Sequence, residues 1–359
     1  MSDNQFLIPA KFGYRMPAEW HRHAATLMHW PSNRETWPGD RLDIVEPVFL
    51  QIIETISRYE PVILLCDPAA IQKAQKLIAD RKIIQNRIHF IEIAVNDVWA
   101  RDCGPICIYR EVDEVIEYAM TDWEYNSWGG KYPPFEDDNQ IPSFLAEKYQ
   151  IPIYQTGIVL EGGSIETNGR GLLLTTESVL LNSNRNPGLD KPEIESFLAD
   201  YLGIEKVIWL KAGLAGDDTD GHIDDLCRFI NEDTVFTSIV NDTGNVNYQV
   251  LQHNLTLLRT ATDQDGRPLN VVEIPLPETK IEGTTVDGSE YVPASYANFY
   301  IANGLVLVPL YDHQFDNDIL ELFKSYFPDR DVIGIDCSDL VWGQGSIHCV
   351  TQQLYGVTL

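Results

Sequence analysis

The chain has 359 residues, 44% of them hydrophobic, and carries 26 basic against 54 acidic residues, for a net charge of −28 at pH 7. So acidic a protein repels nucleic-acid phosphates and anionic membranes and attracts cations, although most of its carboxylates are expected to be solvated at the surface. No long linker or charge block divides the sequence. We therefore expect one domain over residues 1–359, with no nucleic-acid partner.

The location of the protein is predicted from three absences. Residues 1–6 lack the basic region and apolar core of a signal peptide. The longest apolar runs, such as 62–66 and 305–310, are too short to span a bilayer. Six cysteines in so long a chain do not indicate a disulfide scaffold. These features predict a cytoplasmic protein without a membrane partner.

Helical periodicity, with proline or capping residues at permitted positions, recurs along the chain. The predicted helices cover residues 44–59, 68–80, 194–202, 247–261 and 317–327. Asp190 is the expected N-cap of the third helix, and Gly203 is expected to end it.

Pairs of strands are predicted between these helices. Asn168-Gly169 and Asn303-Gly304 indicate tight hairpins, with both turn residues at positive φ. The predicted strand pairs are 164–167 with 171–176, 298–301 with 305–309, and more weakly 104–109 with 114–120 and 223–230 with 234–240. The Cys349 segment is predicted to start a fifth pair.

The β-rich units begin near residues 102, 164, 223, 296 and 346, with helices between them. This spacing predicts an α/β fold of about five repeated units. Closure of such units around a central axis would remove exposed sheet edges. A doubly wound α/β sheet is the alternative.

The segment from Gly343 to Thr351 combines two glycines with a cysteine in an apolar run. Gly343 and Gly345 carry no Cβ, so the backbone there can approach a ligand closely. The thiol of Cys349 can act as a nucleophile where a base or a positive charge assists it. The alternative is a small hydrophobic residue buried in a strand.

An acidic segment, residues 216–225, contains His222 and Asp224, which would share one face of a predicted strand. A carboxylate beside an imidazole orients the ring and raises its pKa, which suits a base that serves a cysteine. A solvated acidic turn is the open alternative. A calcium loop starting at Asp218 is excluded, because Ile223 occupies the position that requires glycine.

Two further segments carry side chains that suit a planar cation. Trp99 can stack on such a cation and Asp102 can bind it bidentately. Glu161 precedes two glycines, so its backbone can also approach a ligand. The alternatives are a surface turn beside a core tryptophan and a strand end. The histidines near the N-terminus lack partners at zinc-like spacing, and no phosphate-binding motif is present.

Taken in order, these segments resemble the agmatine deiminases, a peptidylarginine-deiminase-like family of the guanidine-modifying (pentein) superfamily. The resemblance runs nearly end to end, through residues 16–20, 96–105, 128–130, 161–164, 181–187, 219–224, 294–303 and 347–353. It implies a five-bladed α/β propeller of repeated ββαβ-type units around a pseudo-fivefold axis. Family members are commonly dimers, so a homodimer is also expected.

Roles in catalysis follow from matching positions. The resemblance implies that Cys349 is the nucleophile and His222 the general acid and base. Asp102 and Asp224 would clamp the guanidinium group, and Glu161 would orient the histidine.

The remaining part of the predicted site binds substrate. Trp99 is similar to a wall of the family's pocket, and Trp128 and Gly345 are expected beside it. Asp218 is a candidate for the distal amine. The sequence departs from the family pattern at Gln344, Ser346, Asp220 and Asp225. None of these departures removes a catalytic group.

The resemblance implies hydrolysis of agmatine to N-carbamoylputrescine and ammonia through a covalent thiouronium on Cys349, in putrescine synthesis or agmatine catabolism. It implies no metal and no organic cofactor. Deimination of arginine or peptidyl-arginine is the alternative, because Arg101, Arg185 and Arg228 could meet a carboxylate. A non-catalytic propeller that binds a partner and a cysteine hydrolase of amides are further alternatives.

Overall fold

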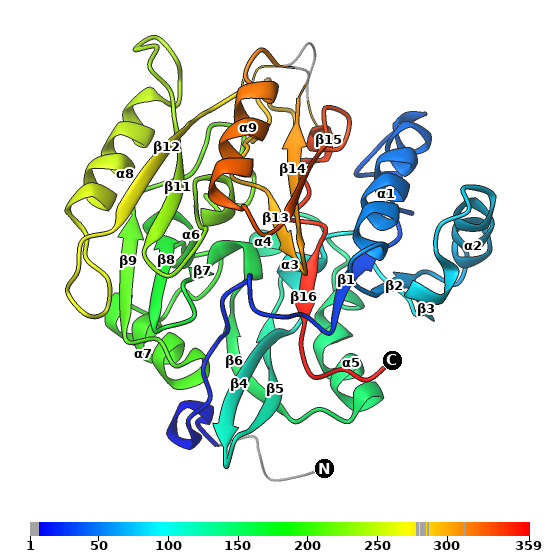
Figure 1. Ribbon diagram of the computed structural model, residues 1–359, viewed down its shortest axis with the longest axis horizontal. Coiled ribbons are helices and arrows are strands. Elements are labelled where there is room, and N and C mark those ends of the chain that lie inside the picture. The colour runs from blue at the N-terminus through cyan, green and yellow to red at the C-terminus, as the bar shows by residue number, and fades with distance from the viewer. Residues whose placement is uncertain (1–6, 278–279, 281–284, 286, 312) are drawn as a thin grey trace.

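The computed structural model describes residues 7–277, 280, 285, 287–311 and 313–359. Residues 1–6, on which the absence of a signal peptide was predicted, lie outside the described residues. The fold is mixed α/β, and the described residues form five separate sheets (Figure 1). Among the described residues, no helix combines the length and the apolar character that crossing a membrane requires.

Four sheets follow one pattern: two antiparallel strands, a helix, and a third strand parallel to the second. The first comprises β4 (Ile106–Val112), β5 (Val115–Glu124), α5 (Ile141–Tyr149) and β6 (Ile153–Val159), and the second β7 (Glu166–Thr167), β8 (Leu172–Thr176), α7 (Lys191–Leu202) and β9 (Lys206–Leu210). The third comprises β10 (Cys227–Phe229), β11 (Thr234–Ile239), α8 (Tyr248–Thr260) and β12 (Asn270–Pro275), and the fourth β13 (Tyr300–Ala302), β14 (Leu305–Leu310), α9 (Asp316–Tyr326) and β15 (Asp331–Asp336).

The fifth sheet joins the two ends of the chain. Its strands are β16 (Gln352–Leu354), β1 (Ala25–His29), β2 (Val62–Cys66) and β3 (Ile88–Glu92), with α1 (Arg41–Ser57) and α2 (Ile71–Asp80) as connections. β16 runs antiparallel to β1, and β2 and β3 continue in parallel, so this unit repeats the pattern of the other four with an added strand. The largest apolar cluster likewise includes Ala25 and Val357.

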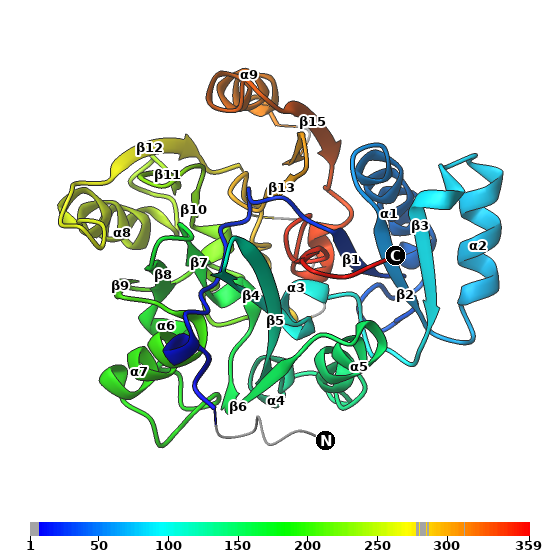
Figure 2. The same ribbon diagram turned by 60° about the horizontal axis from the view of Figure 1, so that its bottom comes forward.

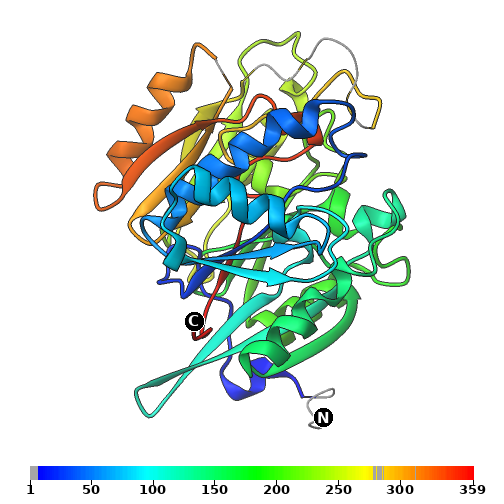
Figure 3. The same ribbon diagram turned by 90° about the vertical axis from the view of Figure 1, so that its right-hand side faces the viewer.

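The helices lie outside the strands. Figure 2 shows α1, α2, α5, α7, α8 and α9 around the rim, with the first strand of each unit toward the middle. In the side view the β4–β5 hairpin extends away from the body of the molecule (Figure 3). Three short helices, α3 (Ala100–Cys103), α4 (Ser127–Gly130) and α6 (Glu177–Leu180), follow strands or connect units. The short 3-10 turns are η2 (Pro9–Phe12), η3 (Gln85–Arg87), η4 (Asp138–Gln140), η5 (Gly162–Ser164), η6 (Ile223–Asp225) and η7 (Val341–Gly343).

The predicted hairpins are confirmed, but their turn type is not. Gly169 and Gly304 have φ of 73° and 70°, whereas neither asparagine before them has positive φ. The side chain of Asn168 instead holds its turn, because its Oδ1 accepts the backbone N–H groups of Arg170 and Leu172 at 2.9 and 3.1 Å. An asparagine side chain that bonds to the backbone two residues ahead is a common alternative way to build a turn.

Two predicted strands were wrong. The segment expected from residue 223 is the 3-10 turn η6, and β10 begins only at Cys227. Cys349 also lies in a turn, ahead of β16, rather than in a strand. A strand would send Asp224 and Asp225 to opposite faces. The 3-10 turn instead lets both carboxylates reach the same neighbours, because Asp224 contacts His348 and Asp225 contacts Asn298.

Candidate active site

Cys349 lines a cavity, lies in the turn between η7 and β16, and is 6% exposed. Its Sγ is 3.2 Å from Nδ2 of Asn298 and 3.8 Å from Oδ2 of Asp224. A Cβ on Gly345 would lie 2.2 Å from the Trp99 ring and 3.0 Å from Cβ of Cys349. Glycine is therefore required at 345 so that Trp99 can pack beside the thiol, and its backbone is not part of the cavity wall.

His222 meets two acidic groups over Gly163. Its Nδ1 is 3.7 Å from Oδ1 of Asp102, and its Nε2 is 4.0 Å from Oε2 of Glu161. A Cβ on Gly163 would lie 2.6 Å from the imidazole, 2.8 Å from Asp102 and 3.1 Å from Asp224. The glycine that follows Glu161-Gly162 thus makes room for three predicted catalytic side chains to converge.

The two predicted clamps are held from different sides. Asp102 accepts hydrogen bonds from Nε1 of Trp128 and the backbone N–H of Gly163, both at 3.0 Å. Asp224 Oδ2 lies 2.7 Å from Nδ1 of His348. Among the described residues, Oδ1 of Asp224 has no hydrogen-bond partner although it is buried. Such an oxygen can accept an N–H of a ligand without losing an existing bond.

Burial and charge shift the pKa values of the two carboxylates in opposite directions, upward for Asp102 and downward for Asp224. Burial raises the pKa of Asp102 to about 6; His222 opposes that rise, and Asp224 and Glu161 add to it. Burial would also raise the pKa of Asp224, but the hydrogen bond and charge of His348 hold it below its ordinary value. A cation bound between the two carboxylates would favour the ionised form of both.

The acidic surroundings raise the pKa of both the Cys349 thiol and the His222 imidazole. Burial raises the pKa of Cys349 well above its ordinary value, and the neighbouring carboxylates raise it further. Burial would lower the pKa of His222, yet Asp102 and Glu161 reverse that effect and raise it. Without a bound cation, these shifts favour a neutral thiol on Cys349 and an imidazole on His222 that holds its proton to higher pH.

The arginines considered as partners for a substrate carboxylate are all occupied inside the protein. Arg185 pairs with Glu161 at 2.5 Å and with a second carboxylate at 2.6 Å. Arg101 and Arg228 both pair with Glu19, at 3.2 and 2.9 Å. None of the three arginines lines the cavity. Asp220 is likewise a structural partner of Arg185 rather than part of the cavity wall.

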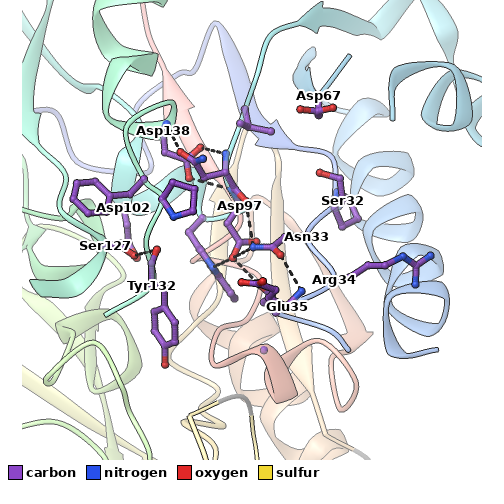
Figure 4. A pocket seen from close by; sticks show the side chains of 18 of the residues that line it. Ser32, Asn33, Arg34, Glu35, Asp67, Asp97, Asp102, Ser127, Tyr132 and Asp138 are labelled. Atoms are coloured by element: carbon purple, nitrogen blue, oxygen red, sulfur yellow. Dashed lines mark hydrogen bonds between the residues drawn. The ribbon is translucent and has the colours of Figure 1, made fainter. Parts of the chain in front are cut away.

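The cavity has a volume of about 790 Å³ and is walled by aromatic and acidic side chains (Figure 4). Trp99 and Trp128 meet nearly edge to face, with ring centroids 6.1 Å apart. Asp218 lines the wall and accepts a 2.6 Å hydrogen bond from the hydroxyl of Tyr132. Asp102 and Cys349 also reach the wall.

The other three predicted catalytic residues adjoin these two: His222 lies 3.7 Å from Asp102, Asp224 lies 3.8 Å from the thiol, and Glu161 lies 4.0 Å from His222. All three are buried, at 1%, 0% and 0% exposure, and they are not part of the wall. Within the described residues, the structure therefore brings together all the predicted catalytic side chains. Of these, only Cys349 and Asp102 reach the cavity wall. Gly345 is the predicted substrate-binding residue that it does not place in the wall.

Some residues at the site were missed by sequence reasoning. His348 joins two carboxylates, with Nδ1 2.7 Å from Asp224 and Nε2 2.8 Å from Glu19. Asn298 holds the thiol, and Tyr132 holds Asp218. The position of His348 directly before Cys349 was the one available signal, because adjacent residues in a turn can support each other.

The mixed α/β fold of five repeated units and the acidic cavity with a buried thiol agree with the class of protein that the sequence resemblance predicted. The family model described as Porphyromonas-type peptidyl-arginine deiminase matches residues 15–354. The chain therefore belongs to this peptidyl-arginine deiminase family.

Individual relatives agree with this assignment. A Legionella pneumophila protein with a provisional name as an agmatine deiminase is 37% identical over 351 residues, 98% of this chain and 97% of that protein. The structure of the agmatine deiminase of Enterococcus faecalis is 33% identical with a TM-score of 0.89, covering 97% of each chain. A cysteine-to-serine variant of C. jejuni agmatine deiminase with substrate bound is 28% identical with a TM-score of 0.83, covering 96% of this chain and 97% of that one.

Proposed function

We propose that the protein hydrolyses agmatine to N-carbamoylputrescine and ammonia. The observation that carries the proposal is the acidic character of the cavity: its lining contains seven carboxyl groups and three basic side chains. The basic groups are already paired, Lys131 with Asp220, Lys73 with Glu46 and, more loosely, Arg34 with Asp43. A cavity of this kind favours a ligand that is cationic at both ends. The names of the Enterococcus faecalis and C. jejuni proteins support the choice of agmatine.

Carboxylates would bind the guanidinium group beside the thiol. Asp102 and Asp224 converge with His222 over Gly163, and one oxygen of Asp224 is without a partner among the described residues. Two acceptors fix the planar cation bidentately and hold its central carbon near Sγ of Cys349. The rings of Trp99 and Trp128 exclude water from the site and add cation–π attraction. The positive charge would also lower the pKa of the thiol.

In the first half of the reaction, the Cys349 thiolate forms a C–S bond to the guanidinium carbon. The bond from that carbon to one terminal nitrogen breaks as His222 gives its proton to the departing nitrogen, and ammonia leaves. An S-alkylthiouronium on Cys349 remains. In the second half, neutral His222 takes a proton from water while the water oxygen attacks the same carbon. The C–S bond then breaks as the remaining hydroxyl proton passes to solvent, which returns the thiolate and releases the neutral ureido product.

Asp218 is our proposed partner for the distal ammonium. It lies on the cavity wall and is oriented by Tyr132. Burial raises the pKa of Asp218 to about 7, against the hydrogen bond from Tyr132. The carboxyl is therefore protonated below about pH 7 in the free protein, and a bound ammonium must draw it into the ionised form.

Replacing Asp218 by asparagine should raise KM for agmatine by about 10- to 100-fold, the worth of a charge-assisted hydrogen bond, and lower kcat by less. KM of the unsubstituted protein should rise as the pH falls below about 7, and the variant should lose that dependence. Steady-state kinetics from pH 6 to 8 measures both. Asp113→Asn on the exposed β4–β5 turn is the control. An unchanged KM would remove Asp218 from the distal site.

The substrate class is tested by offering agmatine, free arginine and an arginine-containing peptide separately and measuring ureido product. Agmatine alone should be turned over, because the described lining offers no unpaired basic side chain for the α-carboxylate of arginine. Turnover of peptides but not agmatine would favour the activity that gives the family its name. No product from any of the three would contradict the deiminase proposal and favour a binding role.

We further propose that residues 1–359 form one domain in which the five units close into a five-bladed propeller. The common strand pattern of the units supports this arrangement, as does the sheet built from both ends of the chain. Six free, buried cysteines are consistent with a reducing, cytoplasmic location. A homodimer and the route that uses the product remain predictions from the resemblance.

A further inference from the structure

A second group of potential ligands lies beside the cavity, apart from the reacting groups. His29 ends β1, Cys103 ends α3, and Asp138 begins η4. One ligand atom from each of these residues lies within 4.8 Å of the other two. All three side chains are buried, at 0%, 2% and 1% exposure. A thiol, an imidazole and a carboxyl group are thus gathered at one point of the interior.

The imidazole of His29 is oriented with a lone pair free. Its Nδ1 is 2.8 Å from the backbone carbonyl of Asp97, an acceptor, so Nδ1 carries the proton. Nε2 is therefore the unprotonated nitrogen, and among the described residues it has no hydrogen-bond partner despite full burial. A histidine whose other nitrogen is held by a carbonyl is the usual arrangement around protein-bound metals.

The other two groups are also positioned by the backbone. The carboxylate of Asp138 accepts the N–H groups of Asn96 and Asp97 at 2.7 and 3.1 Å, which fixes its direction. The thiol of Cys103 contacts the carbonyl oxygen of Trp99 at 3.3 Å. Each oxygen of the carboxylate keeps a lone pair, and the sulfur becomes a strong donor once it loses its proton to solvent.

We propose that His29, Cys103 and Asp138 bind one divalent, thiophilic cation of the Zn²⁺ type. Nitrogen, sulfur and oxygen donors in this combination suit Zn²⁺, with water in the fourth position. Bond lengths of about 2.0–2.3 Å require the donors to approach one another by roughly 1 Å from their present spacing. Asp138 lines the cavity, so an ion would reach the site from that side (Figure 4). The sequence did not reveal the site, because its ligands come from three distant segments.

Cadmium is the probe that tests the site, because a cadmium–thiolate bond has an ultraviolet charge-transfer band. Cys349→Ser in the full chain removes the catalytic thiol, which could bind the ion itself. Titration of this variant with Cd²⁺ should give the band with one equivalent of metal, and Zn²⁺ should displace it. In this background Cys103→Ser should abolish the band, and His29→Gln should raise Kd by at least about tenfold.

The matched control is Cys107→Ser, which removes an equally buried thiol four residues away on β4. It should leave both the band and Kd unchanged. The proposal is overturned if the Cys349→Ser variant shows no band, if the band survives in Cys103→Ser, or if Cys107→Ser removes it equally. Far-ultraviolet circular dichroism checks folding. Where Cys103→Ser does not fold, an unaltered Kd in His29→Gln overturns the proposal.

Discussion

Replacing Cys349 by alanine should lower kcat for agmatine by at least about 10⁴-fold, because removal of a nucleophile leaves only the binding and charge effects of the site. The side chain is small, and its contacts are with Asn298 and Asp224 rather than with the apolar core alone. The variant should therefore fold and still bind agmatine. Ureido product measured at saturating substrate, together with agmatine binding by calorimetry, separates loss of chemistry from loss of binding.

Cys66→Ser is the control for this substitution. Cys66 is equally buried in β2, where burial raises the pKa of its thiol to about 12, so it is inert near neutrality. Its replacement should leave kcat almost unchanged at temperatures well below unfolding.

A cationic haloacetamidine should label the unsubstituted protein on Cys349, and a neutral iodoacetamide of similar size should not. Alanine at 349 with more than about one hundredth of the activity would contradict covalent catalysis.

Much of the fold was predictable because its elements are specified locally. The helix predicted after Asp190 begins with a full capping box and ends at Gly203, which has φ of 66°. The Asn-Gly hairpins were found for a similar reason. The helix α5 was missed, although its proline lies at the permitted start. The two strand errors concern the buried side chains of Asp224, Asp225 and Cys349, whose partners lie more than 50 residues away.

The catalytic side chains were found through the resemblance, whereas their surroundings were not. His222 and Asp224 were expected to share a strand face, yet they converge because η6 turns the chain over Gly163. The three arginines were considered as ligands for a carboxylate, but only tertiary structure reveals that Arg101 and its counterparts are neutralised internally. Residues brought together from distant segments leave no spacing signal in a single sequence.

Replacing His222 by glutamine should lower kcat by about 10²- to 10⁴-fold, the usual contribution of a general acid and base, and should change the pH profile. The reactive form needs a thiolate and a protonated imidazole together. In the unsubstituted protein kcat/KM should therefore show a bell-shaped dependence on pH, because protonation of the thiolate at low pH and deprotonation of the imidazole at high pH both remove the reactive form. Its two apparent pKa values belong to the pair rather than to one residue.

The direction of each shift fixes where the bell lies. Burial and the nearby carboxylates raise the pKa of Cys349, and Asp102 and Glu161 raise that of His222 despite burial. Both apparent pKa values of the profile should accordingly lie above the pKa values of isolated cysteine and histidine side chains, and the pH optimum should be alkaline. In His222→Gln only the thiolate is required, so the remaining activity should rise with pH and then level off. Kinetics from pH 6 to 10 distinguishes a rise from a bell.

His313→Gln provides the control, because His313 lies on the fourth unit and outside the cavity wall, and it is the backbone N–H of His313, not its ring, that donates to Asp316. This variant should keep both the bell-shaped pH profile and the kcat of the unsubstituted protein. A bell that persisted in His222→Gln would mean that another group carries the second ionisation, and His348 would be the first candidate, since it lies between Asp224 and Glu19. Loss of the alkaline limb in His222→Gln alone would instead identify the imidazole as the proton donor to the departing nitrogen.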